Sequence, residues 1–273
     1  MTAVTPPFSL HRAEAFVEAA GTPLERSLWK AGFGCGPVEV LVFELEAHLD
    51  AQGVWRGLGE NEPPGGLASA VAALRLLSTV NLGEDIFEVG ARTVAQLARR
   101  RSADGSWDAP GPWPGGGDGI GRRAWYTAAI GALVGGLTGS APAAEVRRME
   151  EGAARWLEDH WRRLPDPGPA LCWLTLACVG SSRSDAARHL VADAEARLAH
   201  WCAVPRPAAD LAWLHAALRG GGRPAEDGLR RLAWEWLVET QLPDGSWAGE
   251  SDVGWPVSAV EATYHACRAL VRP

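Results

Sequence analysis

The sequence of 273 residues predicts an all-α fold of about six helix pairs, on the strength of three observations. Apolar residues recur at spacings of three and four through most of the chain, as on the buried side of a helix. Val and Ile nowhere alternate with polar residues over a useful length, so no strand is predicted. Gly- and Pro-rich stretches interrupt the helical pattern at intervals too regular for a mixed α/β architecture.

Each predicted helix is an apolar stretch at helical spacing between two such interruptions. In chain order, the helices are expected over residues 11–20, 23–32, 37–50, 66–80, 84–100, 121–137, 143–163, 168–180, 184–203, 207–219, 225–240 and 256–271. We expect one domain over residues 1–273, with the N-terminal segment 1–36 partly outside the clear repeats.

Two internal repeats support the paired arrangement. A turn with Gly two residues before Trp follows a helix at 52–55 (QGVW), 104–107 (DGSW) and 244–247 (DGSW), and each copy leads into a loop and another helix. In the helices, Trp125, Trp173, Trp213 and, less closely, Tyr264 occupy one position of a second repeat, 48, 40 and 51 residues apart. This period fits two helices with their loops.

The last predicted helix decides between an open array and a closed ring. An open array of helix pairs needs polar capping repeats at its ends. Residues 256–271 are instead as apolar as the central helices, so we expect a closed α/α toroid.

The overall composition excludes several classes of protein. With 26 basic and 33 acidic residues the net charge is −7, and no basic run is able to follow a nucleic-acid backbone. The five cysteines are odd in number and scattered, which fits neither a disulfide framework nor a zinc ribbon. No signal peptide and no 18-residue apolar run is found, so we expect a cytoplasmic protein without an integral membrane segment. Lys30 is the only lysine, a bias typical of a GC-rich bacterial gene. The sequence leaves the oligomeric state open.

The turn at 241–247 carries a resemblance to a known family. Its sequence QLPDGSW matches the QxxxGxW signature that recurs in squalene cyclases and their relatives; residues 101–107 repeat it with Arg for Gln, and 49–55 keep only Gly and Trp. Over about residues 37–271 the chain thus resembles the terpenoid cyclase and protein prenyltransferase superfamily. The resemblance implies a toroid whose inner helices surround an apolar cavity, with Trp55, Trp107 and Trp247 serving the architecture.

The resemblance also implies which acid to look for. Protonation-initiated cyclases carry an Asp-x-Asp-Asp motif, in which the middle carboxyl is the general acid. In the closest segment, 207–212, only Asp210 matches, and Ala209 stands at the donor position. Glu261 and Arg122 occupy the position equivalent to Asp210 in their own helices. We therefore take Glu261 and Asp210 as candidate catalytic acids, although helix capping also explains charges at such positions.

Candidate substrate-binding residues come from the same helices. Trp125, Trp173, Trp213 and Tyr264 would stabilise a carbocation by cation–π attraction, and equal spacing also describes core packing. Further candidates are Arg122, His215 and His265, the histidines being as easily hydrogen-bonded core residues.

The sequence leads to three functional hypotheses. The first is a class II terpene cyclase-like isomerase that needs no cofactor and starts cyclisation of a small hydrophobic, isoprenoid-like substrate with an acid. The second is a non-catalytic isoprenoid-binding or scaffold toroid that has lost the acid motif, as Ala209 suggests. The third is zinc-dependent prenyl transfer with Asp210, Cys202 and His265 as ligands, which is disfavoured because Cys202 is expected far from the inner helices, so no metal site is predicted.

Overall fold

The computed structural model describes residues 8–50, 54–55, 66–80, 83–109, 119–137, 139–179, 184–252 and 257–271. These residues form twelve α-helices and three short 3-10 segments, and extended backbone pairs only at one isolated bridge between Leu49 and Trp55. The predicted all-α class is therefore confirmed.

The helices follow one another with short connections. They are α1 (Leu10–Ala20), α2 (Pro23–Phe33), α3 (Val38–Glu46), α4 (Leu67–Thr79), α5 (Phe87–Arg100), α6 (Gly119–Val134), α7 (Ala143–His160), α8 (Pro169–Val179), α9 (Asp185–Trp201), α10 (Ala208–Gly220), α11 (Gly228–Glu239) and α12 (Ala259–Val271). The 3-10 segments Gly83–Ile86, Gly135–Leu137 and Trp161–Arg163 adjoin α5, α6 and α7. Apart from Gly83, they lie within ranges that the sequence predicted as continuous helices.

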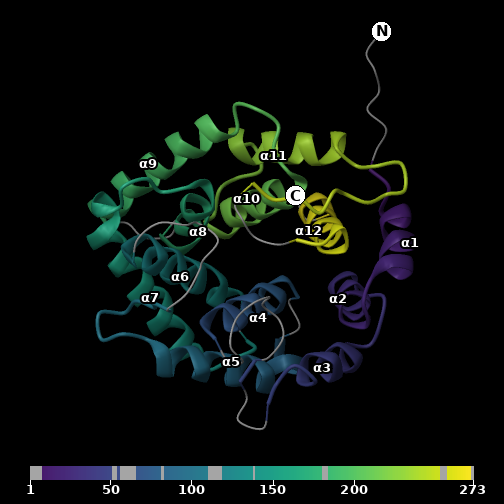
Figure 1. Cartoon of the computed structure of the whole chain (residues 1–273), viewed down its shortest axis with the longest axis horizontal. Helices are drawn as coiled ribbons and strands as arrows, with labels where there is room; N and C mark the ends of the chain where they lie inside the picture. The colour runs from purple at the N-terminus through teal and green to yellow at the C-terminus, as the bar shows by residue number, and fades with distance from the viewer. Residues whose placement is uncertain are drawn as a thin grey trace.

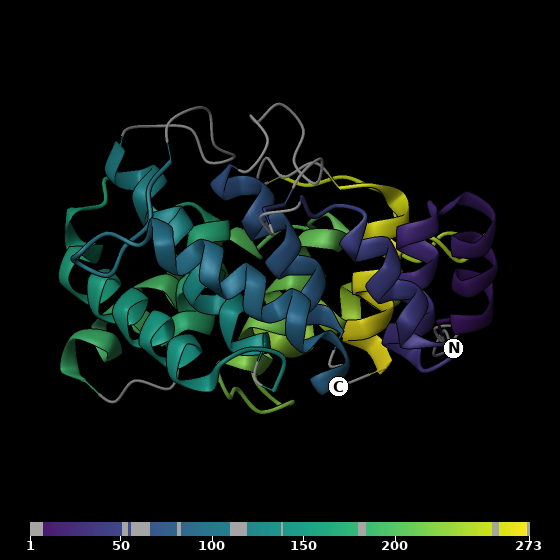
Figure 2. The ribbon, with the colours of Figure 1, turned by 90° about the horizontal axis from the view of Figure 1, so that it is seen from below.

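Odd-numbered and even-numbered helices form two concentric layers. Figure 1 shows α1, α3, α5, α7, α9 and α11 on the outside and α2, α4, α6, α8, α10 and α12 on the inside. Within the inner layer, α4, α6, α8, α10 and α12 contact one another in chain order, and α12 also contacts α2 and the outer α1. The first and last helices thus lie side by side, as Figure 2 also shows, and the molecule is a closed α/α toroid.

The repeated Gly-x-Trp turn links an outer helix to the next inner helix. In the copy at 101–107 the Trp107 indole N–H donates to the Leu97 carbonyl at 2.8 Å, and the Trp107 amide donates to the Thr127 hydroxyl at 3.1 Å. Trp247 repeats both bonds, to Leu237 and Thr263. The tryptophans of all three turns are fully buried. Trp107 and Trp247 each fix an outer helix to the next inner one, whereas the Trp55 indole N–H donates to the Thr93 hydroxyl of the outer helix α5 at 2.9 Å.

The last copy of the turn also closes the ring. The Gln241 side chain accepts from the Ser9 amide at 2.8 Å and donates to the Ser9 carbonyl at 3.2 Å, just before α1 begins. The Arg12 guanidinium adds a 2.8 Å bond to the Pro243 carbonyl. The turn after α11 therefore holds the start of α1.

Within the described part of the chain, every helix is too short or too polar to cross a membrane.

Candidate functional site

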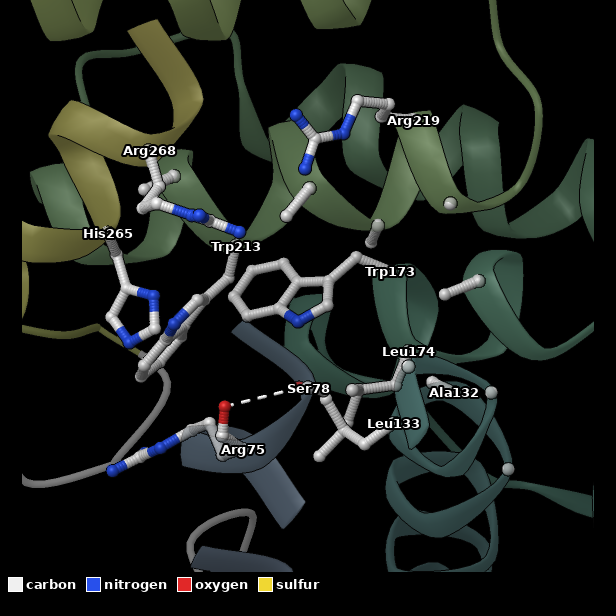
Figure 3. A pocket seen from close by; sticks show the side chains of 18 of the residues that line it. Arg75, Ser78, Ala132, Leu133, Trp173, Leu174, Trp213, Arg219, His265 and Arg268 are labelled. Carbon is white, nitrogen blue, oxygen red and sulfur yellow. Dashed lines mark hydrogen bonds between the residues drawn. The ribbon is translucent and has the colours of Figure 1, made fainter. Parts of the chain in front are cut away.

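A cavity of about 490 Å³ lies inside the ring, and its volume is within the range of small-molecule sites. Residues of α4, α6, α8, α10 and α12 line it, so every inner helix except α2 contributes. Most of its wall is apolar. The side chains of Trp173 and Trp213 form the aromatic part, shown in Figure 3, and alanines and glycines of α6, α8 and α10 form much of the rest.

Charged residues interrupt this apolar wall. Arg75, Arg219 and Arg268 line the cavity from α4, α10 and α12, and Glu150 reaches it from the outer helix α7. The Arg75 guanidinium lies over the Trp213 ring, 5.1 Å from the ring centroid. The Arg75 backbone carbonyl accepts a hydrogen bond from the hydroxyl of Ser78, one helical turn later, drawn as the dashed line in Figure 3.

Glu261 lies behind the cavity wall rather than in it. One carboxylate oxygen is 2.7 Å from Arg75 Nη2 and 3.5 Å from His265 Nε2, and both of those residues do line the cavity. Burial by itself raises the pKa of this carboxyl, but the Arg75 cation and His265 outweigh it, so the pKa of Glu261 lies below its ordinary value. Glu261 is therefore ionised at neutral pH and paired with Arg75.

His265 is the titratable group between Glu261 and the cavity. Its ring meets the Trp213 ring edge-on, with centroids 5.7 Å apart, and its side chain is almost fully buried. Burial lowers the pKa of His265, partly offset by the adjacent Glu261 carboxylate. Protonated His265 is consequently a stronger acid than a histidine in water, with the Glu261 carboxylate 3.5 Å behind it.

Asp210 is buried at the first turn of α10, but it is not part of the cavity lining. Its carboxylate accepts from the Ser251 hydroxyl at 2.7 Å and from the Asp252 amide at 2.8 Å. Burial raises the pKa of Asp210 to about 6, more than the two hydrogen bonds lower it. In this position the carboxyl fixes the segment that follows the last Gly-x-Trp turn.

The shared register of Arg122, Asp210 and Glu261 does not join them into one cluster. Arg122 pairs with Asp108, at 2.9 Å from Nε to the carboxylate, whereas Asp210 and Glu261 have the separate partners described above. The partners of the three residues lie in different parts of the ring: Asp108 before α6, the 251–252 segment before α12, and Arg75 in α4.

The repeated aromatic position does not face one common space either. Trp173 and Trp213 line the cavity, but Trp125 packs edge-on against Tyr126, and Tyr264 packs against Trp29 and Phe33. Neither Trp125 nor Tyr264 is among the cavity-lining residues.

Of the two predicted histidines, only His265 reaches the cavity. His215 points toward the outer layer, where its Nε2 accepts from Arg230 Nε at 3.3 Å, and burial together with Arg230 lowers the pKa of His215 to about 4. It is a neutral packing residue between α10 and α11.

The sequence patterns missed the charged lining residues. Arg75 is the only charged residue in the otherwise apolar helix α4, and Arg268 lies in the most apolar half of α12. A lone charge on a buried helix needs a partner or a polar cavity, so these arginines did carry a usable signal. Glu150 had none, because α7 is rich in charges on its exposed side.

Among the described residues, no three side chains of His, Cys, Asp and Glu gather as they would around a metal ion. Asp210, Cys202 and His265 in particular are not brought together, since Asp210 bonds to the 251–252 segment and His265 faces Glu261.

Comparisons with known proteins place this geometry in context. No protein-family model matches the chain, and no curated protein matches its sequence. Among solved structures, it resembles the apo form of the type II terpene cyclase MstE from Scytonema, with a TM-score of 0.54 over 92% of this chain and 87% of that one. Because only 14% of the residues are identical, the likeness concerns the fold: the chain has a terpenoid cyclase-like α/α toroid.

Proposed function

We propose that this chain is a terpenoid cyclase-like isomerase that binds a small isoprenoid-like substrate in the central cavity and cyclises it after protonation. The observation that carries the proposal is the cavity itself. It lies within a cyclase-type toroid, and its wall combines Trp173 and Trp213 with small apolar residues. A wall of this kind holds a flexible hydrocarbon and offers aromatic faces to a developing cation.

Proton delivery is assigned to the Glu261–His265 pair. His265 stands at the cavity wall, and the Glu261 carboxylate behind it stabilises its protonated form. Transfer of a proton from His265 to a terminal alkene carbon, or to an epoxide oxygen, leaves a carbocation that the next double bond attacks to close a ring. Loss of a proton from the cyclic cation ends the reaction, so substrate and product are isomers.

Arg75 has a supporting role in this scheme. At 2.7 Å from Glu261 it keeps that carboxyl ionised, so the proton resides on His265 and not on Glu261 when the pair carries one. Asp210 is the alternative carboxyl, but it fits a structural role better because its two hydrogen bonds face the 251–252 segment.

The test is product analysis by mass spectrometry after incubation of the purified protein with linear prenyl diphosphates, squalene and their epoxides, with and without magnesium. We expect a cyclic isomer formed without metal. Glu261→Gln removes the charge behind His265 and should lower turnover at least about 100-fold. The exposed Glu88→Gln, on outer helix α5, serves as the matched control. Unchanged turnover in Glu261→Gln would remove the pair from the mechanism.

A non-catalytic isoprenoid-binding toroid is the second candidate. Two observations favour it: Ala209 stands at the usual donor position, and neither Asp210 nor Glu261 lines the cavity. Binding of substrates from the same panel without any cyclic product would support this function over the first.

A further inference from the structure

The outer helix α3 carries more apolar side chains than the ring uses. Six of its nine residues are apolar, but the two that are fully buried are Leu41 and Leu45. Val40 and Phe43, one helical turn apart, are 47% and 72% exposed. Figure 1 shows α3 on the outside of the ring next to α5, whose first residue, Phe87, is also exposed. Single exposed apolar residues are ordinary, whereas neighbouring ones on one helix indicate a contact surface.

The helical geometry places Phe43 on the outermost side of α3. At about 100° per residue, it lies opposite to Leu41 and Leu45, which face the ring. A groove of about 220 Å³ runs along one side of this exposed face, and a groove of about 310 Å³ runs along the other. Residues of α3 line the first groove, with Val42 in its wall, and residues of both α2 and α3 line the second, with Val40 in its wall.

The two grooves carry opposite charges. Glu39 and Glu46 line the first, whose described lining includes no basic residue, so we call it the acidic groove. Arg26 and Lys30 line the second against one carboxylate, that of Glu44, so we call it the basic groove. The exposed face of α3 therefore has an apolar centre, an acidic side and a basic side, and each side matches the other.

We propose that this face binds a second copy of the chain, with the two α3 helices side by side and running in the same direction. A two-fold axis parallel to α3 places the acidic groove of each copy against the basic groove of the other and brings Phe43 of both copies to the centre. An antiparallel pair would place the two acidic grooves against each other, where like charges repel. The charges thus favour a second copy as the partner and select one orientation for it.

Sedimentation equilibrium of the full chain, over about 1 to 300 µM, measures this association. We expect a monomer–dimer equilibrium with a dissociation constant on the order of 10 µM, because an interface centred on one short helix is small. Phe43→Glu should weaken the dimer at least about tenfold, since it places two like charges at the centre. Trp234→Glu, which changes an exposed apolar residue of the outer helix α11, is the matched control and should leave the dimer unchanged.

Charge reversal tests the orientation. Glu39→Lys/Glu46→Lys makes the acidic groove basic, and Lys30→Glu leaves Arg26 facing two carboxylates in the basic groove. Each variant alone should associate about tenfold more weakly than the wild type, because its facing grooves have like charges. An equimolar mixture of the two variants should form a mixed dimer again, since the charges are then opposite at both contacts.

A matched control accounts for the other contact of Lys30. Lys30→Glu also breaks the exposed ion pair of Lys30 with Glu18, 3.0 Å apart, but such a pair contributes little to stability. Arg231→Glu reverses a charge of an exposed ion pair on α11 and should leave the dimer unchanged.

Three results would overturn the inference. They are a monomer over the whole concentration range, a dimer that Phe43→Glu leaves intact, and a dimer that Lys30→Glu leaves intact, which would contradict the parallel orientation. Monomeric wild-type chain that sediments with phosphatidylcholine vesicles through Phe43 would assign the face to a lipid surface instead. Because the surface lies outside the ring and no measurement uses a substrate, these results are independent of the proposed function.

Discussion

Asp210 shows how one buried carboxyl connects stability to pH. Its pKa is about 6 in the folded protein, against about 3.9 in an unfolded chain, because burial disfavours its charged form. The folded state therefore holds this proton more tightly. The resulting stabilisation is complete below about pH 4 and is lost as the pH rises through about 6.

We predict that Asp210→Asn flattens this part of the stability profile. Between pH 5 and pH 8 the wild-type protein should lose about 1 kcal/mol of unfolding free energy that the variant does not lose. At pH 5 the variant should be about as stable as the wild type, since the largely protonated Asp210 carboxyl and an amide each offer one carbonyl oxygen and one donor group to Ser251 and Asp252. Urea unfolding at both pH values measures the difference, and parallel profiles would show that Asp210 does not titrate in this range.

At the scale of the helix, the sequence predicted where the elements lie better than which way they face. All twelve predicted ranges contain a helix, because the spacing of apolar residues and the Gly/Pro breaks are local properties. An inner helix, however, is buried on nearly every side, as α8 and α10 are. The spacing of apolar residues then does not show which side chains face the cavity and which pack against other helices. For this reason Trp173 and Trp213 reach the cavity, whereas Trp125 and Tyr264, at the same position of the repeat, do not.

The turn glycines allow a matched prediction about the connections between helices. Gly105 and Gly245 have φ of 89° and 91°, which any side chain would strain by about 1–2 kcal/mol. A Cβ at Gly105 would lie 3.0 Å from the Gly152 carbonyl, but one at Gly245 would overlap the backbone of Arg12 in α1. Gly245→Ala should therefore cost clearly more stability than Gly105→Ala in urea unfolding. Equal costs would mean that α1 moves away without penalty.

On the scale of the whole molecule, closure makes the first and last helices neighbours, though almost the full chain separates them. Ala13 and Val17 of α1 are completely buried, and α1 packs against α12, whose residues His265 and Arg268 line the cavity. No residue of α1 lines the cavity itself. In a closed ring, the cavity wall formed by α12 should therefore depend on the presence of α1. An open array would not have this dependence, since in an open array each repeat contacts only its neighbours in sequence.

A chain lacking residues 1–21 tests this dependence. Removing residues 1–21 takes away the hydrogen-bond partners of Gln241 and Pro243 and uncovers one side of α12. We expect the truncated chain to lose at least about 3 kcal/mol of unfolding free energy, and to form cyclic product at least about tenfold more slowly than the full chain in the product assay. An open array would lose the stability of one terminal helix and keep the cavity. Unchanged turnover in a folded, truncated chain would therefore show that the cavity does not depend on ring closure.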